Sequence, residues 1–328
     1  MMQRKSIITM VMIIILVIGM ILNLSIGSTF MSLKTIFNAI VADDHSKDAL
    51  IINTIRLPRL FVAIMVGISL AVGGAIMQAL TKNALASPQT FGINAGAALL
   101  LVASIVYLPG HSDTINPYIA FLGAIVGGLI VYTFIYGHEN NHVRLALAGM
   151  TIHLLLSSIT EVLIILNENS TDVLYWLTSS LNGKDWDGVQ ILLPWFVIGV
   201  SVALFLAKDL TVLSLGDIFV TSLGLHKKLK YLIFSFIVII LAGSSVAVAG
   251  PIAFIGLIAP HISRRLIGGW YEKNLYFTAL TGAVILVYAD TLSHIIAYPY
   301  ESPVGIVTAL IGRPFFLYLC KNGRSGLK

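Results

Sequence analysis

Residues 138–142 read HENNH, a spacing that matches the H-E-x-x-H motif of zinc metalloproteases. On one face of a helix, His138 and His142 would bind the zinc ion and Glu139 would act as the general base. However, Gly137 precedes the motif and two asparagines lie inside it, which favours a break in the chain rather than a helix. A third ligand is not apparent in a later apolar segment. The residues favour a polar turn between two apolar segments, with a zinc protease as the distant alternative.

A second group of ionisable residues lies inside an apolar stretch, MTIHLLLSSITEVLIIL (150–166). His153, Ser157 and Glu161 are spaced four apart, so they would lie along one stripe of a helix, with Thr160 beside them. Ionisable side chains inside a membrane are costly and by default indicate a polar pathway or a buried contact. Two interpretations stay open: a translocation pathway, which an ion gradient could also drive, or a His–Glu pair that is satisfied between helices.

Four further charged or titratable residues lie at the ends of two apolar segments. Arg56 and Arg59 occur in RLPR, just before one such segment, and Asp290 and His294 are four apart near the end of another. The aspartate and the histidine could pair with each other. Alternatively, they could form an outward docking surface together with the two arginines.

The composition limits what kind of protein can position these residues. The chain of 328 residues is 57% hydrophobic and only 11% charged, whereas a soluble domain carries roughly 25% charged residues. This composition predicts an all-α polytopic membrane protein. A single cysteine, Cys320, excludes a disulfide framework within the chain. No basic face interleaved with aromatic residues indicates a nucleic-acid partner.

Apolar segments recur along the chain and predict about ten transmembrane helices in contact with membrane lipid. They cover roughly 7–26, 58–81, 90–108, 118–137, 143–166, 190–207, 231–249, 252–268, 276–297 and 303–320. The distribution of Lys and Arg predicts a multi-pass protein with both termini in the cytoplasm. Arg56 and Arg59 then lie on the opposite side, which suggests a functional role for them. No GxxxxGK[ST] motif is present, so any ATPase must be another chain.

Small residues spaced four apart predict close helix packing at three places. These are Gly67 with Ala71, Gly92 with Gly96, and Gly123 with Gly127.

A polar segment, LSLGDIFVTSLGLHKKLK (213–230), predicts two short pieces separated by glycine, with Gly216 and Gly224 eight apart. Such a long, ordered-looking connection between two spans is unusual, and it is a reasonable docking site for a cytosolic partner.

Several segments together resemble the permease subunits of bacterial ABC importers for iron–siderophores, haem and vitamin B12, the type II importers. They are RLPRLFVAIMVGISLAVGGAIMQALTKNALASPQTFGINAGAAL, LGDIFVTSLGL, GPIAFIGLIAPHISRRLIG and ESPVGIVTALIGRPFFLYL. The match runs in order from about residue 30 to 320.

The resemblance implies a single transmembrane permease domain over 1–328, in the bacterial cytoplasmic membrane. It implies pairing with a second permease subunit, identical or different, and with an extracytoplasmic substrate-binding protein. Two cytosolic ATPases would use ATP and Mg²⁺ and dock at about 214–229, while this chain would bind no cofactor or metal and catalyse no reaction. The coupling residues implied are Ser214, Leu215, Gly216, Asp217, Leu223 and Gly224.

The resemblance also assigns Arg56 and Arg59 to contacts with glutamates of the binding protein. A third contact, often arginine in ADxxAR, falls on His294 in ADTLSH, which departs from the family pattern. NALASP likewise departs from N-P-L-A-[DES]-P at Ala84. The expected cargo is a ferric siderophore or similar iron chelate, moved by alternating access, with haem or cobalamin as the alternative.

Overall fold

The computed structural model describes residues 2–42, 46–108, 112–135, 142–166, 176–298 and 300–322, and in this part of the chain all regular structure is helical. The long helices are α1 (Met2–Ser25), α4 (Leu57–Thr81), α5 (Ile93–Tyr107), α6 (Asn116–Ile135), α7 (His142–Ile165), α9 (Trp186–Phe205), α12 (Lys227–Ala249), α13 (Ile255–Ile267), α14 (Tyr271–Ile296) and α15 (Val304–Asn322). Each predicted apolar segment coincides with one of these helices.

Shorter helices connect the long ones. They are α2 (Leu33–Val41), α3 (Lys47–Ile51), the π-helical turn η1 (Ile52–Arg56), the 3₁₀ turns η2 (Pro88–Phe91) and η3 (Asp113–Ile115), α10 (Ala207–Leu215) and α11 (Asp217–Ser222). The helices α3 and α4 follow one another through η1 without a break.

The long helices divide into a central pair and a surrounding layer. Seven described helices are long and apolar enough to cross a membrane, and α5 and α15 are shorter apolar helices. The apolar windows of α4 and α12 are 83% buried, whereas that of α1 is only 17% buried. The protein interior therefore forms around α4 and α12, and apolar side chains of the outer helices face outward, as lipid-facing side chains do.

Small residues bring three described helix pairs into backbone contact, one of them α4 and α13, where Gly74 faces Gly256. A Cβ atom placed on Gly67 of α4 would lie 2.5 Å from the carbonyl oxygen of Gly282 on α14, and one on Gly282 would collide with Ala71. The same relationship joins α5 and α6, where Gly96 faces Gly123 and Gly127 faces Gly92. The predicted close packing is confirmed, because only glycine permits these approaches.

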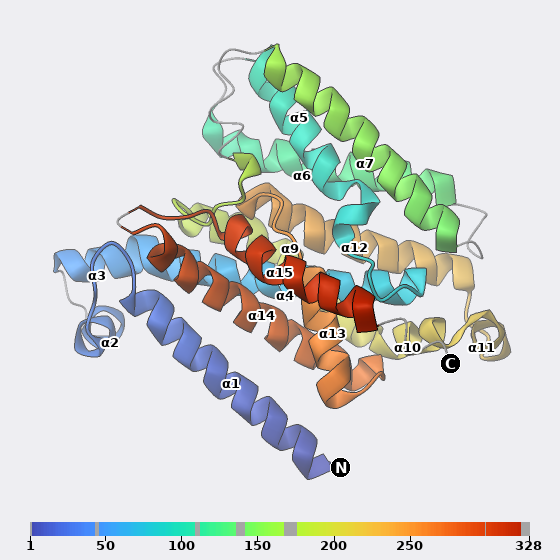
Figure 1. Cartoon of the computed structure of the whole chain (residues 1–328), viewed down its shortest axis with the longest axis horizontal. Helices are drawn as coiled ribbons and strands as arrows, with labels where there is room; N and C mark the ends of the chain where they lie inside the picture. Colours follow the sequence, from blue (N-terminus) through green and yellow to red (C-terminus); the bar gives the residue numbers. More distant parts are fainter. Residues whose placement is uncertain are drawn as a thin grey trace.

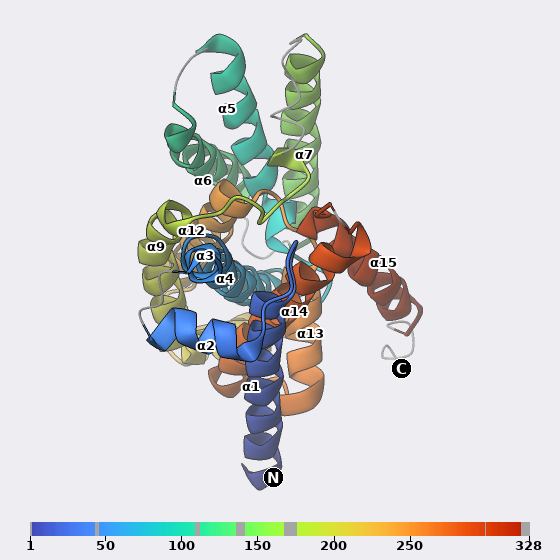
Figure 2. The ribbon, with the colours of Figure 1, turned by 90° about the vertical axis from the view of Figure 1, so that its left-hand side faces the viewer.

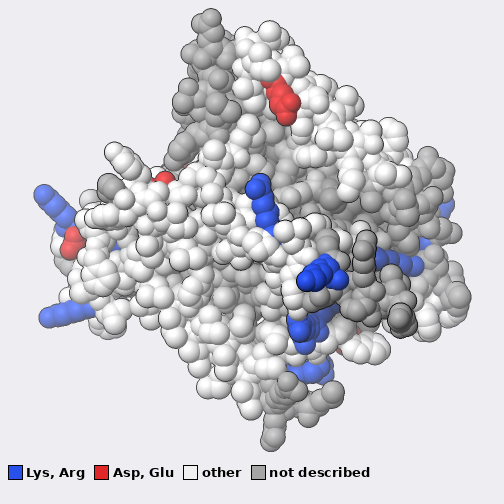
Figure 3. Space-filling model, viewed as in Figure 1, with Lys and Arg blue, Asp and Glu red and all other residues white. Residues whose placement is uncertain are grey.

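The connecting helices lie at two opposite ends of the bundle. Figure 1 shows α2 and α3 at one end and α10 and α11 at the other, while Figure 2 looks onto the end that carries α2 and α3. Helix α4 begins at the α2–α3 end. Most of the Lys and Arg on the face drawn in Figure 3 lies toward the end with α10, α13 and the C-terminus.

Candidate functional site

Arg59 is held by two carboxylates where α4 begins. Its Nε and Nη2 donate to Asp290 of α14, with Nη2 to Oδ1 at 2.8 Å, and its Nη1 donates to Oε2 of Glu301 at 2.6 Å. The side chains of Arg59 and Asp290 are 6% and 0% exposed, while that of Glu301 is 25% exposed. The guanidinium is thus bonded on both edges, and Glu301 is the partner that solvent can reach.

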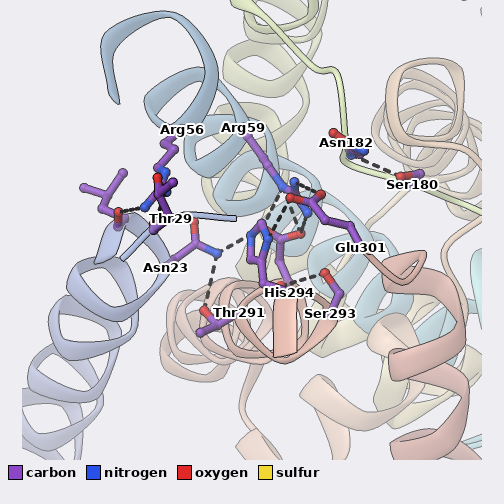
Figure 4. Close-up of polar contacts among 12 residues, drawn as sticks. Asn23, Thr29, Arg56, Arg59, Ser180, Asn182, Thr291, Ser293, His294 and Glu301 are labelled. Carbon is purple, nitrogen blue, oxygen red and sulfur yellow. Dashed lines mark hydrogen bonds and ion pairs between the residues drawn. The ribbon is translucent and has the colours of Figure 1, made fainter. Parts of the chain in front are cut away.

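Two further side chains complete this Arg59 cluster, which comprises Asn23, Arg59, Asp290, His294 and Glu301 (Figure 4). Asn23 of α1 donates to Oδ2 of Asp290 at 2.9 Å. His294 Nδ1 lies 3.1 Å from Oε1 of Glu301, and its Nε2 lies 3.8 Å from Oδ2 of Asp290. The cluster joins three helices and the segment after α14, so it fixes that end of the bundle.

Glu301 is strongly acidic in this setting. The hydrogen bond from His294 and the nearby Arg59 guanidinium outweigh burial and lower its pKa from 4.5 to about 2. Glu301 therefore stays ionised well below neutral pH and keeps Arg59 neutralised.

Arg56 lies outside the cluster, although it is only three residues from Arg59. It is the last residue of the π-helical turn, and its Nη1 and Nη2 each donate at 2.5 Å, to the backbone carbonyls of Leu24 and Thr29. It is also buried, and the structure describes no ion pair for it. Its guanidinium instead holds the end of α1 and the segment that leads to α2 through these two hydrogen bonds.

The structure thus brings Arg59 and His294 together, with Arg56 one turn away, and buries all three. Their predicted contact with a substrate-binding protein stays a prediction. Asp290 pairs with both Arg59 and His294, so the predicted Asp–His pairing is present, whereas the docking surface stays a prediction. Glu301 and Asn23 were not predicted. Their only signals were an isolated glutamate between two apolar segments and an asparagine inside the first.

The predicted coupling segment forms a short helix between two glycines. Gly216 (φ 120°) ends α10 and Gly224 (φ 70°) follows α11, so both adopt backbone conformations that favour glycine. Leu215 and Leu223 are 51% and 62% exposed, and so is Phe219 at 53%, which sequence reasoning did not select. Val220 on the other face is fully buried and anchors the helix. The segment presents apolar side chains at one end of the bundle.

The remaining coupling residues lie within the same segment. Ser214 donates to the carbonyl of Thr211 at 2.6 Å inside α10, and Asp217 is the first residue of α11. The coupling function of the segment stays a prediction.

The four predicted pathway residues all lie on α7. Glu161 is exposed and Ser157 half-buried, while Thr160 is buried and donates to the carbonyl of Leu156 at 2.8 Å. His153 is half-buried, and its Nδ1 is a buried atom without a hydrogen-bond partner. The structure describes no ion pair between His153 and Glu161. The role of these residues in a pathway stays a prediction.

The HENNH motif falls largely outside the described residues. His142 is the first residue of α7, and His138 and Glu139 precede the part of the chain that the structure describes there. Within the described ranges no three His, Cys, Asp or Glu residues come together in a way that could hold a metal ion.

Comparisons with known proteins cover almost the whole chain. The model of a family described as the FecCD transport family matches residues 15–322. The Fe(3+)-citrate import system permease protein YfmD of Bacillus subtilis is 51% identical over 95% of this chain and 93% of its own length. The Fe(3+)-citrate import system permease protein YfmE of the same organism is 36% identical over 97% and 96% of the two chains. A solved metal-chelate type ABC transporter in an inward-facing conformation has a TM-score of 0.81 and 27% identity, covering 97% of this chain and 99% of that one.

Proposed function

The chain belongs to the FecCD transport family, and from this membership we propose that it is the membrane-spanning subunit of an ABC importer for ferric citrate or a similar iron chelate. The observation that supports this choice of substrate is the 51% identity to a Fe(3+)-citrate permease over 95% of the chain. A match over 312 residues includes most of the membrane-spanning helices of the chain. The family match over residues 15–322 also supports a single permease domain.

The chain is a permease and not an enzyme, so its contribution is conformational. We propose alternating access, in which partner ATPases use ATP and Mg²⁺ and act through the segment 214–229. Support comes from the exposed apolar residues Leu215, Phe219 and Leu223, since a surface helix with this character is suited to a protein partner. The positive-φ glycines on both sides set the helix off from α10 and α12 as a separate unit.

We place the extracytoplasmic binding protein at the opposite end, over the Arg59 cluster. Arg56, Arg59 and His294 gather there, and Glu301 is the partly exposed partner of Arg59. A carboxylate from a binding protein could take over the position of Glu301 on Nη1 of Arg59 without disturbing the buried Asp290. This orientation puts both termini in the cytoplasm, and the gathering of Lys and Arg toward the other end supports it.

We propose that the second permease is a different chain. YfmD and YfmE of Bacillus subtilis are each named as a permease protein of an Fe(3+)-citrate import system, and this chain is more similar to YfmD, at 51%, than to YfmE, at 36%. The partner would then resemble YfmE. The pathway between the two subunits would be lined by the exposed Glu161 and the half-buried His153 and Ser157 of α7, with the buried Thr160 behind them. The apolar window of α7 is only 22% buried within this chain.

Uptake of ⁵⁵Fe in a strain lacking this chain tests the cargo. We expect loss of ferric citrate or ferric siderophore uptake, restored by the wild-type chain, and normal uptake of haem and cobalamin. ATP dependence that persists when the membrane potential is collapsed would exclude an ion-driven secondary transporter. Unchanged uptake of every ferric chelate, or loss of haem uptake alone, would contradict the assignment. Membership in a permease family does not favour the zinc protease alternative.

A further inference from the structure

A basic, partly apolar corner lies where α1 starts and where α13 meets α14. Two adjoining cavities, each of about 230 Å³, share Lys5, Ile267 and Lys273 as lining residues. The three helix ends that form this corner lie on the same side of the molecule in both ribbon views (Figures 1 and 2). Since a water molecule takes up about 30 Å³, each cavity has room for a group of the size of a phosphodiester.

The charged part of the corner is basic. Lys5 and Lys273 come from different helices, and the described residues provide no ion pair for either ammonium. The hydroxyl-bearing residues Ser6 and Thr9 line the first cavity, while Glu272 lines only the second. The shared space therefore offers two cationic groups that the protein itself does not neutralise.

The other part of the corner is apolar. Ile267, Phe277 and Leu280 line the first cavity, and along α1 the side chains of Ile7 and Met10 are 62% and 64% exposed. A groove that is cationic at the helix ends and apolar toward the middle of the spans matches a phospholipid, with its phosphate at the lysines and its chains along α1.

Two aromatic residues give the depth of the corner in the membrane. Trp270 and Tyr276 line the cavities and are 67% and 59% exposed. Exposed Trp and Tyr at the ends of spanning helices lie at the level of lipid headgroups. Basic pockets between spanning helices at this level bind anionic headgroups.

We propose that this corner, formed by Lys5, Ser6, Ile267, Trp270, Lys273 and Tyr276, binds the headgroup of an anionic phospholipid. The lipid phosphate would lie between Lys5 and Lys273 and would connect α1 to the α13–α14 corner. Helix α1 has few other supports, because it packs mainly on α14, where Tyr288 donates to the carbonyl of Ile15 at 3.0 Å. The bound lipid would therefore brace the start of α1. The assignment of this corner to one leaflet of the membrane rests on the proposed function, whereas the proposal that it binds lipid does not.

Native mass spectrometry of the intact transporter, purified in detergent and exposed to defined lipids, tests the site. We expect phosphatidylglycerol to be retained in preference to phosphatidylcholine. Because each basic residue near a membrane surface contributes about 1 kcal/mol, roughly fivefold in affinity, Lys5→Gln with Lys273→Gln should weaken retention about 30-fold. Lys34→Gln with Lys47→Gln removes the same charge from exposed lysines at the opposite end and should leave retention unchanged.

Two further measurements distinguish a bound lipid from misfolding of the variants and from binding of free phosphate. Lys5→Arg with Lys273→Arg keeps both charges and should retain phosphatidylglycerol like the wild type. Retention by this variant would show that the loss in the Gln variant comes from the missing charge and not from misfolding. Inorganic phosphate should not displace the lipid, because it lacks the apolar part. Equal loss in the two Gln variants, equal retention of phosphatidylcholine, or full displacement by inorganic phosphate would each overturn the proposal. None of these readouts depends on which chelate is transported.

Discussion

Arg59 and Asp290, 231 positions apart in the sequence, form a two-pronged ion pair in which Nε and Nη2 of the arginine both donate to the carboxylate. Both side chains are almost completely buried, at 6% and 0% exposure. This ion pair joins the start of α4 to α14. The same two helices also pack backbone to backbone at Gly67 and Gly282. The ion pair therefore lies toward one end of a helix contact that is itself close enough to need glycine on both sides.

Removing one member of this pair should strongly destabilise the protein. Asp290→Asn leaves a buried guanidinium with one charged partner, and removal of one partner of a buried pair costs about 3 kcal/mol or more. We expect a clear drop in the thermal unfolding midpoint of the purified protein. Arg59→Met together with Asp290→Leu removes both charges and should recover most of the loss. A double variant as unstable as Asp290→Asn would show that the charges are not the cause.

The acidity of Glu301 predicts a dependence of stability on pH. Its pKa in the folded protein, about 2, is below its ordinary value of 4.5, so its contribution is present above pH 4.5 and is lost as the pH falls toward 2. The groups that face it are Arg59 and His294, with Asp290 behind them. Denaturant unfolding at several pH values measures this.

In Glu301→Gln that fall in stability between pH 4.5 and pH 2 should be smaller than in the wild-type protein. Glu272→Gln, which changes an exposed glutamate at the other end of α14, serves as the matched control and should behave like the wild type. Identical pH profiles for Glu301→Gln and the wild type would contradict the assigned role of the carboxylate.

Hydrophobic length alone was enough to predict the ten long helices, but not their ends. The third segment was expected from residue 90, yet α5 begins at Ile93 because a 3₁₀ turn precedes it and Gly92 has a φ of 67°. The sixth was expected from residue 190, yet α9 begins at Trp186, where the side chain of Asp185 accepts a hydrogen bond from the backbone of Gly188. Caps and turns use polar residues, which an apolar window leaves out.

The residues of the Arg59 cluster could be predicted only in part. RLPR and the Asp290–His294 spacing identified three of its members, because Arg59 departs from the charge rule for topology and an ionisable pair four residues apart in an apolar segment is costly unless it is paired. The bond between Arg59 and Glu301 depends on how the segment after α14 returns to α4. Backbone contacts such as Ser302 N to Ser293 O at 3.0 Å fix that return. No spacing in the sequence encodes it.

The contact between Gly282 and Gly67 should not tolerate a larger side chain. Gly282→Val would place atoms against the backbone of Gly67 and against Ala71, and neither backbone can move without separating α4 from α14. Overpacking typically costs 1–3 kcal/mol, and we expect a value of about 3 kcal/mol here. Gly269→Val is the control, because no atom lies within 4 Å of its added Cβ. Equal unfolding midpoints for the two variants would refute the close contact.

The exposed face of α11 should be required for assembly with the ATPase. Phe219 is 53% exposed and lies between two glycines, so Phe219→Ser should leave the fold intact and remove an apolar anchor. Central anchors of interfaces typically contribute 2 kcal/mol or more, about 30-fold in affinity. We expect co-purification of the ATPase and ATP-dependent uptake to fall together. Phe37→Ser, at another exposed phenylalanine, in α2 (63%), changes the same residue type at the opposite end. It should leave assembly unaffected, and an ATPase yield reduced equally by both variants would show that the loss is not specific to α11.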